Sequence, residues 1–239
     1  MTSEALSGQE YEKYRMAGRI ASRVKDRLRE IVREGELVLE ICEKVEGWIV
    51  ELGGRPAFPC NIGINEVAAH FTPGPGDETR IPENSIVKLD FGVHVDGYIS
   101  DNAVTYVFDP RYEYLRIAAD EALRSATEAI RAGLRASDIG AVIEREIARY
   151  GCKPVRDLTG HKMERYMIHA GKSLPNVRSI DGNRILEGEV YAIEPFVTIP
   201  SGAGTVVGRD GQIYRLVKEK GVKGDRAREV LEFIKREYR

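Results

Sequence analysis

Two apolar, β-prone runs meet at an Asp-Gly dipeptide in Ile86-Val-Lys-Leu-Asp-Phe-Gly-Val-His-Val-Asp-Gly-Tyr-Ile-Ser-Asp-Asn-Ala-Val-Thr-Tyr-Val-Phe108. An Asp-Gly pair between such runs is typical of a type I′ turn, because both central positions of that turn need a positive φ. The pattern therefore predicts strands over residues 86–91 and 98–108, joined as a hairpin at Asp96 and Gly97.

The register of this hairpin places two aspartates on one face of the sheet. With the turn at Asp96 and Gly97, Asp90 lies opposite Ala103, two positions from Asp101 on the same strand. Side chains alternate along a strand, so two positions preserve the face, and the two aspartates become diagonal neighbours about 7–8 Å apart. Carboxylates at this spacing can converge on a pair of metal ions about 3.5–4 Å apart. A shift of one residue in the pairing of the two strands would place the two aspartates on opposite faces of the sheet.

Two further metal-capable side chains lie in apolar, β-prone surroundings. They are His161 in Leu158-Thr-Gly-His161 and Glu194 in Ala192-Ile-Glu-Pro195. Carboxylates are rarely buried without a partner, and a mixed aspartate, glutamate and histidine set suits Mn, Fe, Co or Zn. We therefore predict that Asp90, Asp101, His161 and Glu194 share divalent cations that activate water for hydrolysis.

Each of these four residues also has a simpler interpretation. Asp90 could cap a strand or helix end, and Asp101 could accept backbone hydrogen bonds in a turn. His161 could be a loop histidine, and Glu194 could form a buried ion pair. For any one residue alone the simpler interpretation is the better one. The four together, with the hairpin geometry and an internal repeat, favour the metal site.

The internal repeat relates residues 81–90 to residues 185–194. Both follow the pattern Ile-x-Glu-x-x-(Ile/Val)-x-x-(Leu/Ile)-acid, with a constant offset of 104 (185 − 81 and 194 − 90). The acid comes at the same place in both copies. We interpret the repeat as a duplicated half-domain, in which each half sends one ligand-bearing strand to a central site.

Composition excludes several classes of protein. The chain has 239 residues, of which 42% are hydrophobic and 31% charged, with a formal net charge of −2. This length can bury a large core, and the near-neutral charge argues against a specific nucleic-acid partner. The sequence contains no stretch suited to a membrane span and no secretory signal, and its three scattered cysteines are typical of a reduced compartment. These features predict a cytoplasmic protein without a membrane partner.

Helical periodicity appears in five segments. Apolar residues recur with helical spacing over about 10–34, 37–52, 112–131, from Ser137 to Gly151, and 225–238. Ser137 is a candidate N-cap for the fourth of these helices. Residues 57–64 look extended, and residues 188–199 are a further predicted strand.

Three other histidines need an interpretation. An uncoordinated imidazole near a metal can donate a hydrogen bond to a carbonyl or to a developing oxyanion, which makes His70 and His169 candidates for catalysis. Both could equally be structural histidines. His94 lies close to the predicted turn, and we expect it to be exposed and without a role.

Several motifs, in the right order along nearly the whole chain, resemble the type 2 methionine aminopeptidases in their compact archaeal form. They are Phe58-Pro-Cys-Asn-Ile-Gly-Ile-Asn-Glu-Val-Ala-Ala-His-Phe-Thr-Pro73, Leu89-Asp-Phe-Gly-Val-His-Val-Asp-Gly97, Ser100-Asp-Asn-Ala103, Leu158-Thr-Gly-His161, Ile168-His-Ala-Gly171 and Ala192-Ile-Glu-Pro-Phe196. The resemblance implies an α/β (α+β) protein with the pita-bread fold. This fold is a duplicated and curved antiparallel sheet with helices outside and two divalent metal ions at its centre.

The resemblance also implies roles for individual residues. Asp90 resembles a ligand of one metal, Asp101 the bridging ligand, His161 the imidazole ligand, and Glu194 both a ligand of the second metal and the proton shuttle. His70 and His169 resemble the histidines that contact the substrate amide and carbonyl. The apolar walls of the methionine pocket are matched by Phe58, Ile168 and Phe196.

The implied function is removal of the initiator methionine from nascent chains by metal-activated hydrolysis. The implied partners are peptides with an N-terminal methionine, with possible proximity to the ribosome, and the implied state is a monomer. Two alternatives stay open. One is a binding module of the same fold that has lost peptidase chemistry and binds RNA or protein, and the other is a relative that cleaves before proline.

One departure from the family pattern concerns the last part of the chain. The family returns from a helical insertion with a strand that bears a fifth, bridging glutamate. Here residues 1–224 match the catalytic domain and residues 225–239 match the start of the insertion, so we expect an incomplete catalytic domain. Glu219, Glu229, Glu232 and Glu237 lie in charged, helical surroundings and do not replace the missing ligand. We therefore expect weak binding of one metal and impaired peptidase activity.

Overall fold

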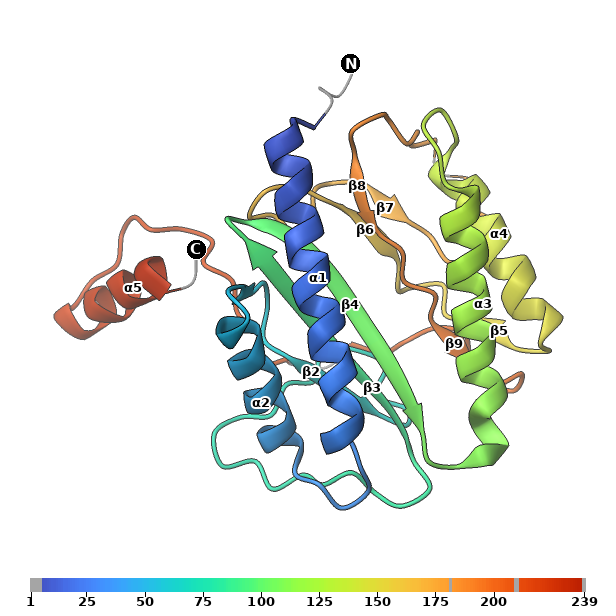
Figure 1. Cartoon of the computed structure of the whole chain (residues 1–239), viewed down its shortest axis with the longest axis horizontal. Coiled ribbons are helices and arrows are strands. Elements are labelled where there is room, and N and C mark those ends of the chain that lie inside the picture. The colour runs from blue at the N-terminus through green and yellow to red at the C-terminus, as the bar shows by residue number, and fades with distance from the viewer. Residues whose placement is uncertain (1–5, 181, 209–210, 238–239) are drawn as a thin grey trace.

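A computed structural model describes residues 6–180, 182–208 and 211–237 (Figure 1). The helices are α1 (Gly8–Ile31), α2 (Val38–Glu51), a 3-10 turn η1 (Pro110–Tyr112), α3 (Glu113–Ala129), α4 (Ala136–Arg149) and α5 (Asp225–Glu237). The strands are β1 (Arg55–Pro56), β2 (Asn61–Ile64), β3 (Ile86–Val95), β4 (Tyr98–Val107), β5 (Lys153–Pro154), β6 (Gly160–Met163), β7 (Ser173–Leu174), β8 (Val190–Ala192) and β9 (Val197–Thr198). The mixture of helices and antiparallel strands confirms the predicted class.

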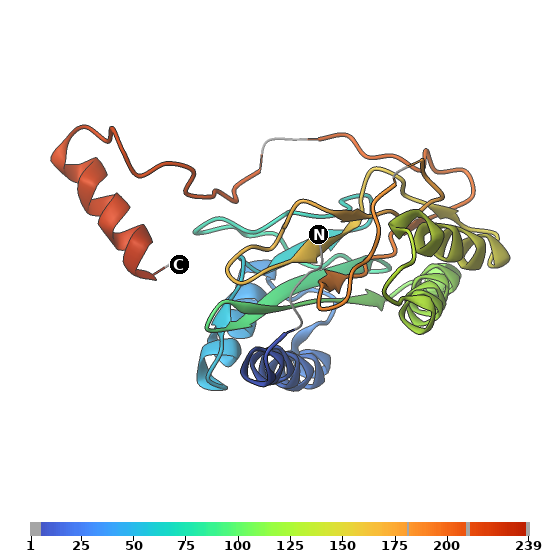
Figure 2. The same cartoon turned by 90° about the horizontal axis from the view of Figure 1, so that it is seen from above.

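The first half of the fold is an antiparallel sheet covered by two helices. Strand β3 pairs with β1, β2 and β4, and helices α1 and α2 pack against the same sheet (Figures 1 and 2). The apolar face of helix α1 points toward the sheet. On this face Ala17, Val24 and Leu28 are fully buried. The core continues through α2 and the inward residues of β3, which include Leu89, Phe91 and Val93.

The predicted hairpin register is confirmed. Val95 pairs with Tyr98 and Asp90 with Ala103, and Gly92 stands opposite Asp101. The two turn residues, Asp96 and Gly97, have φ of 51° and 87°. Both positive values are those that a type I′ turn requires. Strand β3 is longer than the predicted residues 86–91, because the ladder continues to the turn itself.

The second half repeats the plan of the first with shorter strands. Helices α3 and α4 pack on each other, and their core of alanines and isoleucines includes Ala122, Ile139 and Ile143. Strand β6 pairs with β7 and β8, and β5 pairs with β9. In Figure 1 the two halves stand side by side, with α1 and α2 on one side and α3 and α4 on the other.

The internal repeat corresponds to matched hydrogen bonds in the two halves. The amide of Gly35 donates to the carbonyl of Ile81, and the amide of Gly133 donates to that of Ile185, each at 2.8 Å. The guanidinium groups repeat this match, since Arg80 Nη1 donates to the Gly35 carbonyl at 2.8 Å and Arg184 Nη1 to the Gly133 carbonyl at 2.7 Å. The duplication inferred from the sequence is therefore present in the backbone.

Two expected boundaries are wrong, and one extended stretch holds a short strand. Within residues 57–64, Asn61–Ile64 forms β2, and β1 (Arg55–Pro56) precedes the stretch. The expected strand over 188–199 is interrupted between β8 and β9, where Pro195 has no amide to donate to a ladder. Ser137 is not an N-cap but lies inside the first turn of α4, because the preceding residue, Ala136, donates its amide to the Asn183 carbonyl at 2.8 Å and the helix begins there.

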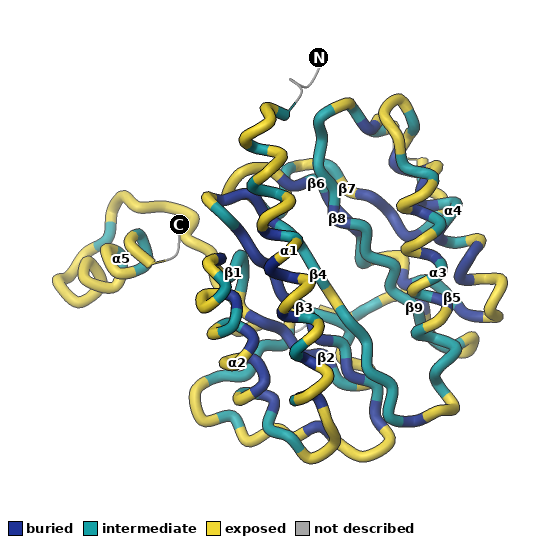
Figure 3. Tube along the Cα trace, viewed as in Figure 1, coloured by how far each residue is buried: buried dark blue, intermediate teal, exposed yellow. Residues whose placement is uncertain are grey.

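Helix α5 lies apart from both halves. A long connection leads to it from β9, and Figures 1 and 3 show it standing away from the sheets with a largely exposed surface. The structure describes it as Asp225–Glu237, and position 238 of the predicted helix lies outside the described residues. Within the described part of the chain, no helix combines the length and the apolar character needed to cross a bilayer.

Candidate metal centre

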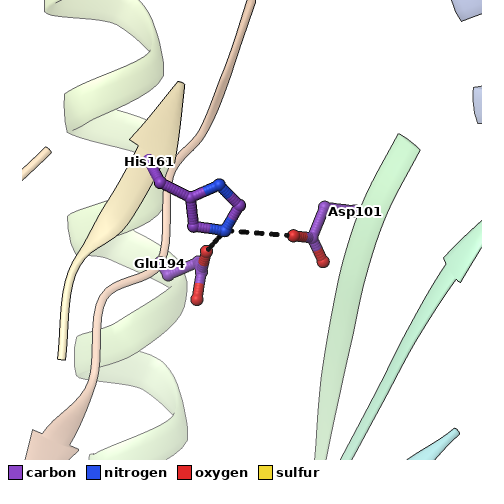
Figure 4. A group of neighbouring side chains, drawn as sticks. All are labelled: Asp101, His161 and Glu194. Carbon is purple, nitrogen blue, oxygen red and sulfur yellow. Dashed lines mark ion pairs between the residues drawn. The ribbon is translucent and has the colours of Figure 1, made fainter. Parts of the chain in front are cut away.

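Three of the predicted ligands converge where the two halves meet. His161 Nε2 lies 2.9 Å from Glu194 Oε1 and 3.4 Å from Asp101 Oδ2 (Figure 4). One ligand atom from each of the three residues lies within 4.8 Å of the others. Asp101 comes from β4 of the first half, and His161 and Glu194 come from the second half. The cluster therefore exists only when the two halves are packed together.

The second-half ligands owe their position to a close approach between strands. His161 follows Gly160 on β6, and Glu194 follows β8 after two residues. A Cβ on Gly160 would stand 2.3 Å from the Ala192 carbonyl oxygen, so only glycine permits the approach of β6 to β8. The chain then leaves the ladder before Pro195, and the Glu194 side chain turns toward His161 (Figure 4).

The cluster perturbs the protonation of its histidine. Burial alone would lower the pKa of His161, but close contact with the Asp101 and Glu194 carboxylates, and their negative charges, raise it to about 10. A proton on the imidazole thus serves as the positive charge between two carboxylates. A divalent cation would supply that charge instead.

Asp90 faces the same cavity but stands outside the cluster of three. Burial, followed by repulsion from Asp101 and Glu194, raises the pKa of Asp90 to about 8. The Asn61 side-chain amide donates to Asp90 Oδ2 at 3.5 Å. A buried carboxyl with so high a pKa marks a concentration of negative charge that lacks a counter-ion.

Unpartnered buried atoms provide a test of whether a cation fits. His161 Nδ1 and Glu194 Oε1 are buried without a hydrogen bond, because the short contact between Glu194 Oε1 and the imidazole lies outside hydrogen-bonding geometry. Buried polar atoms nearly always have a hydrogen-bond partner, and an ion that is bound at the site can take the place of that partner. Oxygen and imidazole nitrogen donors also match the preferences of Mn, Fe, Co and Zn. The residues present fit a divalent metal ion.

A cavity of about 390 Å³ opens next to the cluster. Its lining includes Asp90, His161 and Glu194, together with His70, His169 and Phe196. The His169 ring stands edge-on to the His161 ring, with the ring centres 4.3 Å apart. Burial, followed by the positive charge on His161, lowers the pKa of His169. The imidazole of His169 is therefore neutral near pH 7 and can donate one N–H.

Two of the residues proposed for substrate binding lie elsewhere in the structure. Phe58 does not line the cavity but packs against β3, where a Cβ on Gly92 would stand 2.5 Å from the Phe58 ring. Ile168 packs against the small apolar cluster of Ile99, Met163 and Ala192 beside the site. Their roles stay predictions.

The expectation for His94 is wrong. Its side chain is buried rather than exposed, and its Nδ1 accepts a hydrogen bond from the Gly97 amide at 3.1 Å. The Tyr166 ring lies edge-on to it, with the ring centres 5.7 Å apart. Proximity to a turn suggested exposure, but a loop from the second half covers this turn.

Asn61 is a residue that reasoning from the sequence missed. It is 3% exposed and pairs with Asp90 across β2 and β3. An asparagine in an otherwise apolar strand was a usable signal, since buried polar side chains need a partner. Lys172, Asp157 and Thr159 also line the cavity and carried no signal of their own in the sequence.

A duplicated fold with an Asp-His-Glu cluster between its halves is the architecture of a metal-dependent hydrolase. The sequence model of Metallopeptidase family M24 matches residues 12–222, and the chain belongs to this family. Membership of a metallopeptidase family implies the use of divalent metal ions.

Curated relatives extend the match over almost the whole chain. A methionine aminopeptidase from Thermococcus onnurineus is 47% identical over 224 residues, which make up 93% of this chain and 75% of that protein. A methionine aminopeptidase from Methanothermobacter thermautotrophicus is 44% identical over 231 residues, or 95% of this chain and 77% of that protein.

Solved structures agree on the fold. The crystal structure of methionine aminopeptidase from Thermotoga maritima has a TM-score of 0.79 and 26% identity, and the match covers 89% of this chain and 88% of that one. A prolidase from Pyrococcus furiosus has a TM-score of 0.69 and 26% identity, covering 82% of this chain and 58% of that one. The predicted pita-bread fold is confirmed by these neighbours.

Proposed function

We propose that this chain is a methionine aminopeptidase that removes the initiator methionine from nascent proteins. The observation that carries the proposal is the convergence of Asp101, His161 and Glu194 from both halves into one cluster beside a cavity, with His161 buried and the two carboxylates partly buried. Relatives 44–47% identical over 93–95% of the chain bear the name methionine aminopeptidase. Both kinds of observation support the same activity.

Asp101, His161 and Glu194 would hold a divalent ion, and Asp90 would add a carboxylate for a second one. When bound, the metal supplies a Lewis acid and lowers the pKa of water at the site. Mn, Co, Fe and Zn all suit this donor set. Two ions are the number that the resemblance implies, and the position formed by Asp101, His161 and Glu194 is the one that we propose this chain holds. Proximity of opposite charge would also return the pKa of Asp90 toward its ordinary range.

The protein's own groups divide the remaining work. Glu194 is the proposed proton shuttle, because its carboxylate lies at the base of the cavity next to His161. His169 and His70 stand at the cavity wall, where a neutral imidazole can donate a hydrogen bond to a peptide carbonyl or to the oxyanion that develops from it. The α-amine of the substrate would approach the carboxylates, which limits the reaction to N-termini.

Phe196 supplies an apolar wall within the cavity, and Phe58 and Ile168 are proposed as further walls of the methionine pocket. The unbranched thioether of methionine fills irregular apolar space well. Substrates are nascent chains or peptides with an N-terminal methionine, met in the cytoplasm and close to the ribosome, and the enzyme acts as a monomer. Residues 1–224 form the catalytic unit and residues 225–239 the start of a helical subdomain.

An inactive binding module of the same fold is disfavoured by the cluster itself. Three metal-capable groups that are buried together cost stability when no ion neutralises them, and a binding module has no need to keep them.

The test is hydrolysis of a peptide beginning Met-Ala by the full chain, after metal removal and reloading with Mn²⁺ or Co²⁺. We expect slow release of free methionine that requires the ion, in line with the weak metal binding expected from the sequence, with no cleavage of an N-acetylated copy and little cleavage of an Ala-Pro peptide. Calorimetric titration on the same sample gives the number of ions bound. Metal-saturated protein that leaves the Met-Ala peptide intact would contradict the proposed function.

A further inference from the structure

A turn in the second half is fastened to the tip of the hairpin in the first half. After β6 the chain reverses between Glu164 and Met167, whose amides and carbonyls exchange hydrogen bonds of 2.9 Å in both directions. Arg165 and Tyr166 are the central residues of this turn, and Tyr166 has a φ of 58°. In Figures 1 and 2 the loop after β6 lies beside the end of the hairpin formed by β3 and β4.

Two hydrogen bonds join the two turns. The amide of Tyr166 donates to the carbonyl of Gly97 at 2.8 Å, and Arg165 Nε donates to the carbonyl of Asp96 at 2.8 Å. These carbonyls belong to the two central residues of the β3–β4 turn. The contact therefore ties the centre of one turn to the centre of the other.

Ring contacts complete the junction. A Cβ on Gly97 would stand 2.5 Å from the Tyr166 ring, so the ring lies directly on the hairpin tip. The Arg165 guanidinium lies 5.3 Å from the centre of the Tyr166 ring and 5.4 Å from that of Tyr98. We call the contacts of Arg165 and Tyr166 with residues 96–98 the clasp.

The hairpin tip that receives the clasp is itself held by α1. Lys13 Nζ lies 2.8 Å from Asp96 Oδ2, and the Tyr98 hydroxyl donates to Glu10 at 3.0 Å. These contacts fix the hairpin tip relative to α1. A loop that is bonded to the tip is therefore held in a defined position as well.

The clasped loop carries His169, three residues after Tyr166. The Ala170 amide donates to the Lys162 carbonyl at 2.8 Å and holds the other end of the loop against β6. Between these two anchors the His169 ring reaches the His161 ring and the cavity wall. His169 is exposed as a residue, although its ring is partly desolvated against His161, so the two anchors of the loop support its position.

We propose that Arg165 and Tyr166 are positioning residues of the aminopeptidase, which hold His169 at the substrate carbonyl by clasping the β3–β4 tip. Neither side chain lines the cavity, and both act through the loop between them and His169. The inference rests on the proposed function for its effect on catalysis. The alternative is that the clasp only adds stability.

The experiment compares Arg165→Ala and Tyr166→Asn with the wild-type chain loaded with Mn²⁺. Asparagine tolerates the positive φ of residue 166 and removes the ring. We expect kcat on the Met-Ala peptide to fall roughly tenfold or more, since small misplacements of a catalytic group are costly, while KM and the calorimetric affinity for Mn²⁺ change little. Tyr166→Phe, which keeps the ring, and Met167→Ala, at a 48% exposed position of the same turn, should keep wild-type rates.

Amide hydrogen exchange gives a readout that does not depend on activity. In Arg165→Ala and Tyr166→Asn, exchange should rise over residues 164–170, including the Ala170 amide, and stay unchanged in α3 and α4. Unchanged exchange over residues 164–170, or faster exchange with wild-type kcat, would overturn the proposal. If the wild-type chain does not cleave Met-Ala peptides, the proposed function fails on its own, and the exchange of residues 164–170 still decides whether the clasp orders the loop.

A double-mutant cycle separates positioning from stability. In a His169→Ala background, Arg165→Ala should reduce kcat less than twofold, because the group that the clasp positions is already absent. Effects of Arg165→Ala that multiply with those of His169→Ala would show that the clasp acts by another route and would refute the role proposed for it.

Discussion

Single residues shape the metal-ligand cluster. Gly160 permits the approach of β6 to β8, and Pro195 removes a donor from the strand that would otherwise continue past Glu194. Asn61 donates to Asp90 and holds the carboxylate at the edge of the cavity. Each of these residues helps to position one of the proposed metal ligands.

At the residue scale, protons and metal compete for the same atoms. The pKa of His161 is about 10 and that of Asp90 about 8 in the metal-free protein. Both groups must lose a proton to bind an ion, so metal affinity should rise with pH, about tenfold per unit for each proton displaced. Calorimetric titration with Mn²⁺ at pH 6, 7 and 8 measures this slope. His161→Ala should lower the affinity at all three pH values and reduce the slope, whereas an affinity independent of pH would contradict the ligand assignment.

Elements are held by buried polar contacts at their ends. The tip of β3 and β4 depends on His94, and the start of β8 depends on Glu189, whose side chain is 2% exposed. Both residues lie outside the proposed ligand set. Their contributions belong to stability, and each can be tested separately from catalysis.

Acid should weaken the hairpin through His94. Burial, followed by the positive charge of Arg55, lowers the pKa of His94 below 6.5. The unfolded chain therefore takes up this proton first, so the contribution is complete above pH 6.5 and is lost as the pH falls below it toward the folded-state pKa. His94→Asn keeps an acceptor for the Gly97 amide without a titrating group. Below pH 6.5 we expect the wild type to lose more of its free energy of unfolding than the variant does. Urea titration of both proteins measures this difference. A difference that stays constant from pH 7.5 to 5 would refute this.

Glu189 connects the second-half strands. It lies 2.6 Å from Lys172 Nζ and accepts hydrogen bonds from the Leu186 amide and the Tyr191 hydroxyl, each at 2.8 Å. Removing one partner of a buried ion pair leaves the other uncompensated, so Glu189→Ala should lower the free energy of unfolding by about 3–5 kcal/mol.

The matched control is Glu128→Ala. Glu128 pairs with Arg124 on the surface of α3, with its side chain 65% exposed, and the change should cost less than about 1 kcal/mol. If the two variants lose equal stability in denaturant titrations, the contacts of Glu189 contribute no more than those of an exposed ion pair.

At the scale of the whole molecule, the two halves meet at the proposed metal. Asp101 comes from the first half and His161 and Glu194 from the second. This cluster is one of the places where the two halves touch. The clasp at the hairpin tip and the apolar contact of Ile99 with Met163 and Ala192 are others.

Metal should therefore stabilise the entire fold. An ion that binds only the folded chain adds about 2.7 kcal/mol at a concentration a hundred times its dissociation constant. We expect Mn²⁺ to raise the melting temperature of the wild-type chain and a chelator to reverse the increase. The same addition should leave His161→Ala unchanged. A melting temperature that is indifferent to Mn²⁺ in the wild type would argue against a site shared by the two halves.

The hairpin, its register and the duplication followed from the sequence. The Asp96-Gly97 turn is a local property, because it needs only two residues that accept a positive φ. The register then follows by counting, and the repeat at an offset of 104 reflects two halves that make the same bonds, as Arg80 and Arg184 do. These features depend on short stretches of chain, and short-range chemistry determines them.

Only the tertiary structure decided how the site is assembled. Asp101, His161 and Glu194 meet while Asp90 stands aside, His94 is buried, and Arg165 and Tyr166 hold the loop of His169. All of these features depend on how the two halves pack against each other. Asp101, for example, is 60 residues before His161 in the sequence (161 − 101). Local pattern carries no information about that packing, since it is set by the sum of many distant contacts.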